Sequence, residues 1–366
     1  MGFNERQYAA FCDAFREAAT REALKYDPRE TAILVNDISE GPDFRRLRAA
    51  GFRIVTVYHV DVVAYIAAIY LHGRLAPATL TRVWEWTRRL HLEQFAPQIL
   101  RLIFAQQRAS LEYSDIVVVP SSGMKATLLA CYPGIPVDRI RVLPWGAPPP
   151  ECGPEQAQAA ANTLRREYQV PDNAQVLLCL SRISPEKGQD RLLEALAEWE
   201  RSGSLPDRPL WLFICGEPAF MQGERHMRRL RSLAAALKRV KVVFPGYASG
   251  ARKGGFFALS DLYIFPSRHE SYGLTLMEAL AAGLPAVCLD HQGSREVMRA
   301  DTGRMLMEGD SLWRVVAELL SHDAERRAMG VAARQYAALR PFSQSAARLA
   351  EWLQAGSQQR EGRINR

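Results

Sequence analysis

Short apolar segments alternate with helical segments along the second half of the chain, and this alternation constrains the fold more than any other sequence feature. The apolar segments are continuous, so both faces of each strand are expected to be buried. Short buried strands that alternate with helices are typical of a parallel sheet covered on both faces. We therefore predict a doubly wound α/β domain with strands at Val176–Leu180, Trp211–Cys215, Val240–Phe244, Leu262–Phe265, Ala286–Leu289 and Arg304–Met307.

The first half shows the same alternation with fewer strands, expected at Ala32–Asn36, Ile54–Tyr58, Ile116–Val119 and Ile140–Leu143. Helical segments are expected over 1–25 and 76–110, and a Pro-rich stretch that follows marks a domain boundary. We expect an N-terminal Rossmann-like domain over 1–147, a linker over 148–164, a C-terminal Rossmann-like domain over 165–340, and over 341–366 a C-terminal helix with a polar, frayed tail.

Composition and charge exclude several classes of protein. The 366 residues are 48% hydrophobic and 24% charged, as in ordinary folded globular chains. The formal net charge is +7, but it comes from 41 Arg and 6 Lys that are interleaved with acidic residues, so no nucleic-acid partner is expected. Contact with an anionic membrane surface stays open.

Targeting and metal-binding signals are absent from the sequence. The polar N-terminus lacks the apolar core of a signal peptide, and no segment is long and apolar enough to span a membrane, so we expect a cytoplasmic protein. The six cysteines are scattered without zinc-ligand spacing or a disulfide framework, so no metal site is expected.

Two cations follow the strand at Val176–Leu180, in the segment SRISPEKG at 181–188. Arg182 and Lys187 lie on the loop that leads into a helix, where free backbone N–H groups already favour an anion. An added Arg and Lys suit a phosphate or diphosphate. The alternative is a solvated loop with ordinary helix-start chemistry at Ser184-Pro185.

A second group of polar residues follows the strand at Leu262–Phe265. Glu270 is expected on the loop after the strand and Glu278 in the first turn of the next helix, so both face the crevice beyond the carboxyl ends of the strands. Such a site offers N–H donors for phosphate and carboxylates for sugar hydroxyls. The alternatives are a capping box formed by Thr275 and Glu278, and a solvated loop acid at Glu270.

These segments, in this order, resemble the retaining glycosyltransferases of family 4, a part of glycosyltransferase group 1. The resemblance covers the whole second half and rests on SRISPEKG (181–188), CGEP (215–218), VFPG (243–246), PSRHESYGLTLMEALAAGLP (266–285) and GSREV (293–297). In the first half, DIVVVPS (115–121), RVLPWG (141–146) and the Tyr58-His59 pair after a strand match the later part of that family's N-terminal domain. The resemblance implies the GT-B fold, in which two doubly wound Rossmann-like domains face each other across a cleft.

The resemblance also implies residue roles. Arg182 and Lys187 would hold the donor diphosphate, Glu278 would accept hydrogen bonds from the ribose diol, and Glu270 would contact hydroxyls of the transferred sugar. His59 would approach the sugar from the N-terminal domain; a structural histidine is the alternative. The residues expected to border the nucleotide are Gly216, Glu217, Gly246, Tyr247, Gly273, Leu274 and Thr275.

The N-terminal segment departs from the family. The family's first domain begins with a strand and a Gly-rich loop, whereas residues 1–25 indicate a helix and no such loop precedes Ala32, so we expect this domain to lack its first strands. Aromatic residues of the first half could stack on an acceptor, with core packing as the alternative; they are Tyr58, Trp84, Trp86 and Trp145.

We therefore expect a metal-independent, retaining hexosyltransferase of carbohydrate biosynthesis. A nucleotide-sugar is its donor and co-substrate, no further cofactor is expected, and the acceptor is a sugar, a polysaccharide or a lipid-linked molecule. Cations and a helix N-terminus would stabilise the leaving diphosphate without Mg²⁺. Two alternatives remain, a GT-B sugar phosphorylase and a non-catalytic or half-protein partner that binds nucleotide-sugar; a dehydrogenase is disfavoured because no GxGxxG follows a strand.

Overall fold

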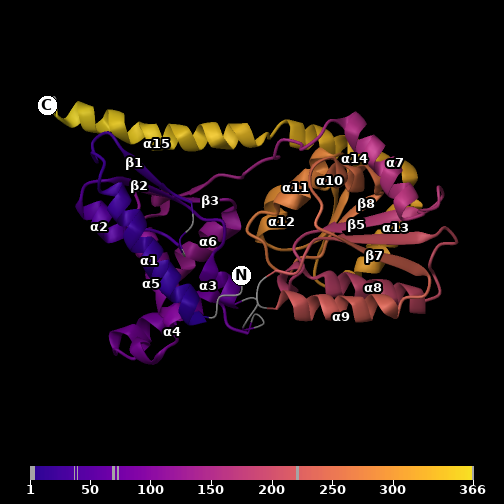
Figure 1. The fold of residues 1–366 in the computed structure, drawn as a ribbon, viewed down its shortest axis with the longest axis horizontal. Helices are drawn as coiled ribbons and strands as arrows, with labels where there is room; N and C mark the ends of the chain where they lie inside the picture. Colours follow the sequence, from indigo (N-terminus) through magenta and orange to yellow (C-terminus); the bar gives the residue numbers. More distant parts are fainter. Residues whose placement is uncertain are drawn as a thin grey trace. The chain divides into compact units, whose positions relative to one another are not determined.

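The computed structural model describes residues 5–36, 38, 40–67, 71, 74–219 and 222–364 (Figure 1). The chain forms two compact α/β units. Unit 1 consists of Met1–Pro144 together with Ser343–Arg366, and unit 2 consists of Trp145–Phe342. The α/β class with parallel sheets predicted from the sequence is confirmed. Each predicted strand is present, with ends that differ by no more than two residues.

Unit 1 is built on a parallel sheet with the strand order β1-β2-β3-β4 in the part that the structure describes. The paired residues include Ile33 with Ile54 and Val57 with Val118, so apolar side chains stack across the sheet. The strands are β1 (Ala32–Val35), β2 (Arg53–Val57), β3 (Ile116–Val119) and β4 (Ile140–Val142).

The helices of unit 1 begin at polar caps where the sequence offers them. Asp43, Asp61 and Ser121 accept the backbone N–H three residues ahead at the starts of α2, α3 and α6, which satisfies a donor that the helix itself leaves open. The helices are α1 (Glu5–Ala23), α2 (Phe44–Ala49), α3 (Val62–Tyr65), α4 (Pro77–Arg89), η2 (Glu93–Phe95), α5 (Gln98–Tyr113), α6 (Ser122–Cys131), η3 (Val137–Arg139) and α15 (Phe342–Ile364).

The helical segment expected over 76–110 is divided into α4, η2 and α5. His91 adopts a φ of +54°, which a helix cannot continue, and Pro97 takes the N-cap position of α5. Pro97, which lies inside the expected segment, is the sequence signal for this division. The C-terminal segment expected as a helix with a polar tail is helical from Phe342 to Ile364.

Unit 2 contains a parallel sheet with the strand order β10-β9-β8-β5-β6-β7. The order reverses between β5 and β8, which pair directly through Leu177 with Leu262 and Leu178 with Tyr263. Its strands are β5 (Gln175–Leu180), β6 (Leu210–Cys215), β7 (Val240–Gly246), β8 (Leu262–Phe265), β9 (Ala286–Leu289) and β10 (Gly303–Leu306).

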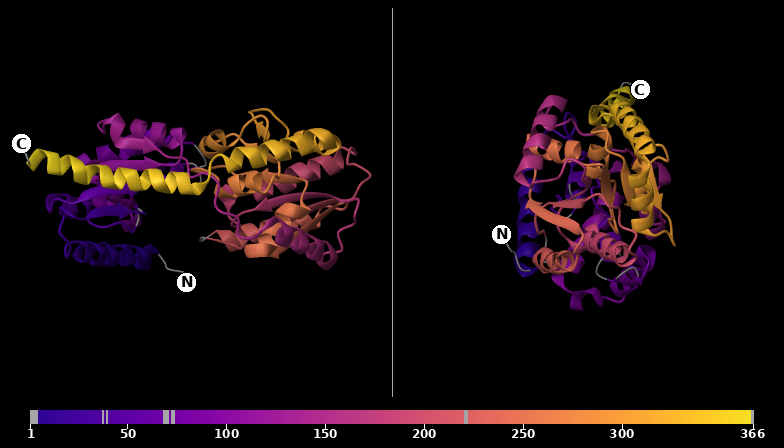
Figure 2. Two further views of the ribbon diagram at one scale, coloured as in Figure 1. Left: turned by 90° about the horizontal axis from the view of Figure 1, so that it is seen from above. Right: turned by 90° about the vertical axis from the view of Figure 1, so that its right-hand side faces the viewer.

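Helices cover both faces of this sheet (Figures 1 and 2). Leu177, Leu212 and Ile264 pack with residues of α8, α9 and α13 on one face, while Phe213 contacts Phe256 of α10 on the other. The helices are α7 (Pro154–Glu167), η4 (Pro185–Lys187), α8 (Gln189–Arg201), α9 (Gly223–Ala235), α10 (Gly250–Leu259), α11 (Leu274–Ala281), α12 (Gln292–Val297), α13 (Leu312–Ser321) and α14 (Asp323–Ala338).

The segment 148–164, expected as a linker, lies within unit 2 and carries most of α7. This helix packs closely on α10 because the facing residues are small. A Cβ on Gly255 would lie 2.8 Å from Cβ of Ala160, and one on Gly254 would lie 2.5 Å from Sγ of Cys152. The Pro-rich stretch therefore leads into a helix of unit 2, and the division between the units falls between Pro144 and Trp145.

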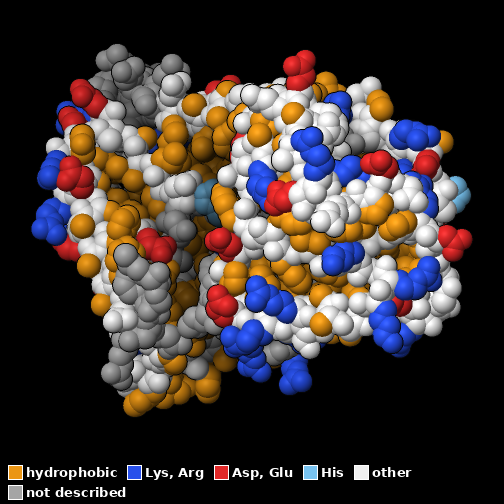
Figure 3. Space-filling model, turned by 45° about the vertical axis from the view of Figure 1, so that its right-hand side comes forward, with side chains coloured by type: hydrophobic (Ala, Val, Ile, Leu, Met, Phe, Trp, Pro, Cys, Tyr) orange, Lys and Arg blue, Asp and Glu red, His pale blue; other side chains and the backbone are white. Residues whose placement is uncertain are grey.

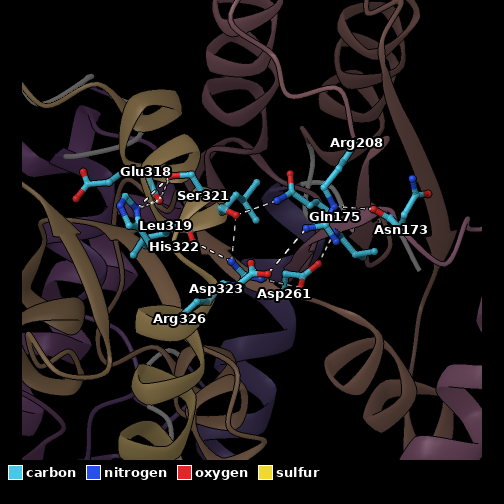
Figure 4. A network of polar contacts seen from close by, with 12 residues as sticks. Asn173, Gln175, Arg208, Asp261, Glu318, Leu319, Ser321, His322, Asp323 and Arg326 are labelled. Atoms are coloured by element: carbon cyan, nitrogen blue, oxygen red, sulfur yellow. Dashed lines mark hydrogen bonds and ion pairs between the residues drawn. The ribbon is translucent and has the colours of Figure 1, made fainter.

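A polar network holds the amino-terminal edge of the sheet in unit 2 (Figure 4). The buried Arg326 of α14 donates to Asp261 at 3.3 Å, to Asp323 at 2.7 Å and to backbone carbonyls at the end of α13. Asp261 in turn accepts from the N–H of Val176 at 2.8 Å. The network satisfies polar groups where β5 and β8 begin, so it has a structural role at the edge opposite the carboxyl ends of the strands.

Candidate functional site

The carboxyl ends of β5 and β8 lie side by side at the point where the strand order reverses. Ligands of open α/β sheets bind at such switch points, beyond the carboxyl ends of the strands. The loop after β5 carries Arg182 and Lys187, and the loop after β8 carries Glu270. The topology therefore brings these sequence-predicted residues to one edge of unit 2.

A glycine lets the two loops touch. Gly188 has a φ of +66°, and a Cβ there would lie 2.0 Å from the carbonyl oxygen of Pro266, a distance that no side chain tolerates. Arg268 then joins the loops, since its N–H donates to the Glu186 carbonyl at 2.7 Å and its guanidinium binds both carboxylate oxygens of Asp190 at 2.8 and 2.9 Å. The backbone around Lys187 and Glu270 is thus held from both sides.

Lys187 and Glu270 form an ion pair in this cradle. Nζ of Lys187 lies 2.5 Å from Oε1 of Glu270, and the two side chains are only 12% and 14% exposed. Oγ of Ser267 donates a further hydrogen bond to Glu270 at 3.0 Å. Burial by itself raises the pKa of Glu270, but the charge and hydrogen bond of Lys187, with a smaller contribution from the hydrogen bond of Ser267, bring this pKa below its usual value. Glu270 is therefore an ionised acceptor at neutral pH.

Arg182 lies at the exposed end of the same loop. Its backbone carbonyl accepts from Nε2 of Gln189 at 2.8 Å, which ties the loop to the first turn of α8. Arg182 is exposed to solvent, in contrast to Lys187, whose side chain is only 12% exposed. Arg182 and Lys187 thus differ in solvent exposure, although the sequence analysis treated them as a similar pair.

Glu278 lies in the second turn of α11, since the helix begins at Leu274 with Gly273 as its N-cap. The capping-box alternative is therefore wrong: Thr275 is inside the helix, and its Oγ1 accepts from the hydroxyl of Tyr263 at 2.9 Å. Oε1 of Glu278 instead accepts from Nζ of Lys253 at 3.1 Å. Glu278 therefore lies one turn further into the helix than the sequence predicted.

Lys253 is a functional candidate that sequence reasoning missed. It comes from α10, its side chain is 14% exposed, and Nζ contacts both Glu278 and Glu151. Burial by itself lowers the pKa of Lys253, but the two carboxylates raise this pKa above its usual value. The residue lies in no motif, and only the packing of α10 beside α11 brings it to Glu278.

The loops after β6 and β7 join the same edge. The N–H of Gly216 donates to the Gly246 carbonyl at 2.8 Å, and the N–H of Ile183 donates to the Glu217 carbonyl at 2.8 Å. Gly216 has a φ of +144°, and a Cβ there would lie 1.9 Å from the carbonyl oxygen of Ser181. Tyr247 is exposed, as is Leu274 at the start of α11. The residues expected to border a nucleotide therefore surround the ends of β5, β6, β7 and β8.

His291 is a second residue that the sequence did not single out. It follows β9 and caps α12, with Nδ1 accepting from the N–H of Ser294 at 3.0 Å. Burial lowers the pKa of His291 to about 4, and Glu270 opposes this shift. The ring is therefore neutral at physiological pH, and because Nδ1 is an acceptor, the proton lies on Nε2, which is buried and has no hydrogen-bond partner among the described residues.

His59 lies in unit 1, directly after β2, and its side chain is exposed. Nε2 of His59 lies 3.0 Å from Oδ1 of Asn36, which follows β1. The structure therefore places His59 at the carboxyl edge of the sheet in unit 1, as expected, while its role toward a sugar stays a prediction. Asp61, two residues on, is buried and caps α3; burial raises its pKa, which hydrogen bonds from Ala64 and Gln107 partly offset.

The aromatic residues that could stack on an acceptor are mostly part of the core. Tyr58 is fully buried, and its hydroxyl lies 2.6 Å from Oγ of Ser110. Trp84 stacks on Phe104 with ring centroids 4.5 Å apart, and Trp145 is buried. Of these four aromatic residues only Trp86 is exposed. For the other three, packing within unit 1 or unit 2 replaces the expected stacking on an acceptor.

Neither a metal cluster nor a membrane span occurs in the described residues. No three or more His, Cys, Asp or Glu side chains within them gather closely enough to hold a metal ion. Among the helices that the structure describes, none combines the length and the apolar character needed to cross a bilayer.

Comparison with known proteins finds similarity to sugar-transferring enzymes. Residues 161–336 match the family of glycosyl transferases group 1. The GDP-mannose-dependent alpha-(1-6)-phosphatidylinositol monomannoside mannosyltransferase of Mycobacterium tuberculosis is 27% identical over 353 residues, which cover 93% of this chain and 86% of the relative. The D-inositol 3-phosphate glycosyltransferase of Corynebacterium efficiens is 33% identical over 244 residues, covering 64% of this chain and 55% of the relative.

Solved structures give the same picture of the fold. Sucrose-phosphate synthase from Thermosynechococcus elongatus has a TM-score of 0.71 at 22% identity, covering 97% of this chain and 80% of that one. HepE of Anabaena, solved in complex with UDP, has a TM-score of 0.67 at 18% identity, covering 93% of this chain and 81% of that one. These likenesses confirm the GT-B fold that the sequence motifs implied.

Proposed function

We propose that the chain transfers a hexose from a nucleotide-sugar to an acceptor with retention at the anomeric carbon, because residues 161–336 match the family of glycosyl transferases group 1. The observation that carries the proposal is the buried Lys187–Glu270 pair at the switch point of unit 2, with Glu278 one helix turn inside α11. A cation for phosphate and a carboxylate for hydroxyls lie next to each other there.

The roles of the site residues follow from their charges. Breaking the bond between the sugar and the diphosphate places negative charge on the leaving group, and Lys187 and Arg182 lie on the loop where cations would stabilise that charge. Glu270 accepts hydrogen bonds from sugar hydroxyls and stabilises positive charge that develops on the ring. Glu278 accepts hydrogen bonds from the ribose diol, while a role of His59 toward the sugar stays a prediction.

The donor needs no metal ion in this proposal. The two cations neutralise the diphosphate, a task that Mg²⁺ performs in sites without them. The reaction takes place in the cytoplasm, where nucleotide-sugars are the donors for carbohydrate biosynthesis. The acceptor is a lipid-linked sugar alcohol, a proposal supported by the relative whose name includes a phosphatidylinositol monomannoside.

A thermal-shift screen with UDP, GDP and ADP tests donor binding. A ligand that binds the folded state raises its stability by mass action, so one of the three is expected to raise the melting temperature in proportion to the logarithm of its concentration. The same experiment on Glu278→Gln should show a smaller shift. Glu318→Gln, a change on the surface of α13 far from the motifs, should behave as the wild type.

Transfer itself is tested with the matching nucleotide-sugar, with EDTA present, and with the product anomer assigned by NMR. Activity that survives EDTA and gives the donor's anomeric configuration supports the proposal. An inverted product, a requirement for Mg²⁺, or turnover only with inorganic phosphate would contradict it.

A further inference from the structure

Helix α4 of unit 1 exposes a stripe of apolar side chains. Val83, Trp86 and Leu90 are 51%, 60% and 50% exposed. Their spacing of three and four residues places them on one side of the helix, because successive residues turn by about 100°. Large apolar side chains aligned on an exposed helix face mark a surface that another body covers.

The opposite side of α4 already has its partners. Thr81 is buried, and Trp84 stacks on Phe104 of α5. Glu85 forms an ion pair with Arg108, also of α5, at 2.5 Å. The helix also packs on α6. The apolar stripe is therefore a second apolar side of α4, and it faces away from the core of unit 1.

The stripe continues beyond the end of α4. Leu92 is exposed, and Phe95 of η2 is 79% exposed, so the chain presents two more apolar side chains next to the stripe. Figure 3 shows hydrophobic side chains gathered at the lower left end of the molecule, the end where Figure 1 places α4. We call Val83, Trp86, Leu90, Leu92 and Phe95 the α4 patch.

Cations flank the α4 patch. Arg82 and Arg89 are exposed and lie beside Trp86 on the helix surface, one turn before and one turn after it. Neither has a carboxylate partner within 4.0 Å among the described residues. The segment 74–101 contains five Arg and two Glu, which makes its formal charge +3. Arginine side chains of this kind reach from an apolar interface toward anionic headgroups.

We propose that the α4 patch is a docking surface for an anionic lipid bilayer. Trp and Phe prefer the boundary between headgroups and acyl chains, and the flanking arginines bind lipid phosphates, so the helix would lie in the plane of the interface. The positive charge of segment 74–101 favours an anionic bilayer over a second copy of the chain. A second copy that docked through the same patch would bring the same positive charge to it, and the two would repel each other. The proposal concerns unit 1 alone and does not depend on the donor or the acceptor.

Vesicle flotation with the full chain tests the proposal. The protein should float with vesicles of phosphatidylcholine that contain about a third phosphatidylglycerol, and bind pure phosphatidylcholine at least about tenfold more weakly. Raising the salt concentration should weaken binding, because ions screen the arginines. Equal binding to both vesicles, or none to either, would overturn the proposal.

Two variants and a control assign binding to the patch. Trp86→Ser with Phe95→Ser should abolish flotation, and Arg82→Glu with Arg89→Glu should reduce affinity for anionic vesicles about tenfold or more. Val137→Ser, which removes an equally exposed apolar side chain elsewhere in unit 1, should float as the wild type. Unchanged melting temperatures and unchanged donor hydrolysis would show that the variants are folded.

Other occupants give different results. If the patch binds a second copy, Trp86→Ser with Phe95→Ser will convert a dimer into a monomer in sedimentation experiments without any effect on vesicle binding, and the proposal is overturned. Loss of transfer activity with intact flotation would count against the proposed function and leave the docking surface standing.

Discussion

Lys187 and Glu270 depend on each other because both are buried. Each would lose hydration without gaining a partner if the other were removed, and an unpaired buried charge is strongly unfavourable. In the absence of a donor, the pair holds the cation and the carboxylate in place. A donor whose diphosphate and sugar meet at this point would contact both residues, which ties phosphate binding to sugar orientation.

Removing the cation should slow the chemical step. Lys187→Ala is expected to lower kcat about a hundredfold or more at saturating donor, because a cation at the leaving diphosphate contributes about 2–4 kcal/mol in the transition state. Steady-state kinetics measure this, with Lys241→Ala, a lysine on β7, as the control. Full activity in Lys187→Ala would contradict the assignment.

A second substitution of Lys187, Lys187→Met, should change the response of stability to pH. The folded-state pKa of Glu270 is depressed, so its ionisation adds stability above the unfolded-state pKa, and this stability is lost as the pH falls through the folded-state pKa. In Lys187→Met, burial remains and the opposing cation is gone, so the pKa of Glu270 should rise. Protonation of Glu270 as the pH falls from about 7 to 5 should then favour the folded state, so the melting temperature of Lys187→Met should rise relative to that of the wild type over this range.

Lys253 is expected to act through Glu278. Lys253→Met leaves the carboxylate without the cation that orients it, so affinity for the donor nucleotide should fall about tenfold while kcat changes little. Lys253→Arg should restore part of the affinity. Arg252→Met, on the same helix, breaks the ion pair with Glu167 and should leave nucleotide affinity unchanged, as titration calorimetry would show. Equal losses in both variants would indicate a general effect on α10.

At the scale of elements, the site is a set of loops that are in contact through their backbones. Gly188 brings the loop after β5 onto the loop after β8, and Gly216 brings the loop after β6 onto the loop after β5. Both approaches leave no room for a Cβ. The site edge is therefore held by backbone contacts, and side chains such as Arg268 add to them.

A methyl group at this contact should be costly. Gly188→Ala is expected to destabilise unit 2 by about 3–4 kcal/mol and to weaken nucleotide binding, because the Cβ would meet the Pro266 carbonyl. Gly203→Ala is the matched control: its φ is +71°, but nothing lies within 4 Å of its Cβ, so only the backbone strain of about 1–2 kcal/mol applies. Chemical denaturation compares the two, and equal losses would show that the contact adds nothing.

At the scale of the whole molecule, the chain returns to unit 1 at its end. Residues from Ser343 onward belong to unit 1. There the backbone carbonyl of Trp352 accepts a hydrogen bond from the guanidinium of Arg53 at 2.8 Å. The indole ring of Trp352 lies 5.2 Å from the guanidinium of Arg141. Unit 1 is therefore completed by residues that lie two hundred positions from the rest of it in the sequence.

Removing this contact should affect one unit and not the other. Trp352→Ala is expected to lower the stability of unit 1 by about 1–3 kcal/mol. Nucleotide should still raise the stability of unit 2. Hydrogen exchange of peptides from β2, β4 and β5 would separate the two units. Leu339→Ala, an exposed apolar residue at the end of α14, is the control and should change neither. Loss of protection in both units would show that they unfold together.

The strands were predictable because burial on both faces leaves a continuous apolar run, and Leu262–Phe265 and Ala286–Leu289 have the predicted bounds. The proximity of Lys187 and Glu270 was also predictable, since residues directly after parallel strands meet at one edge. Local signals were less reliable. Thr275 and Glu278 have capping-box spacing, yet the helix begins at Leu274, and Gly273 with its positive φ is the N-cap.

The sequence by itself determined the α/β class, the family motifs and the side chains available for the site. Only the tertiary structure decided that Lys253 reaches Glu278, that His291 lies near Glu270 as a neutral ring, and that α15 belongs to unit 1. The reason is physical: strand and loop positions follow from periodicities within a few residues, whereas these contacts join residues far apart in the chain. Their closeness depends on how helices pack on the sheet, and no local pattern records that packing.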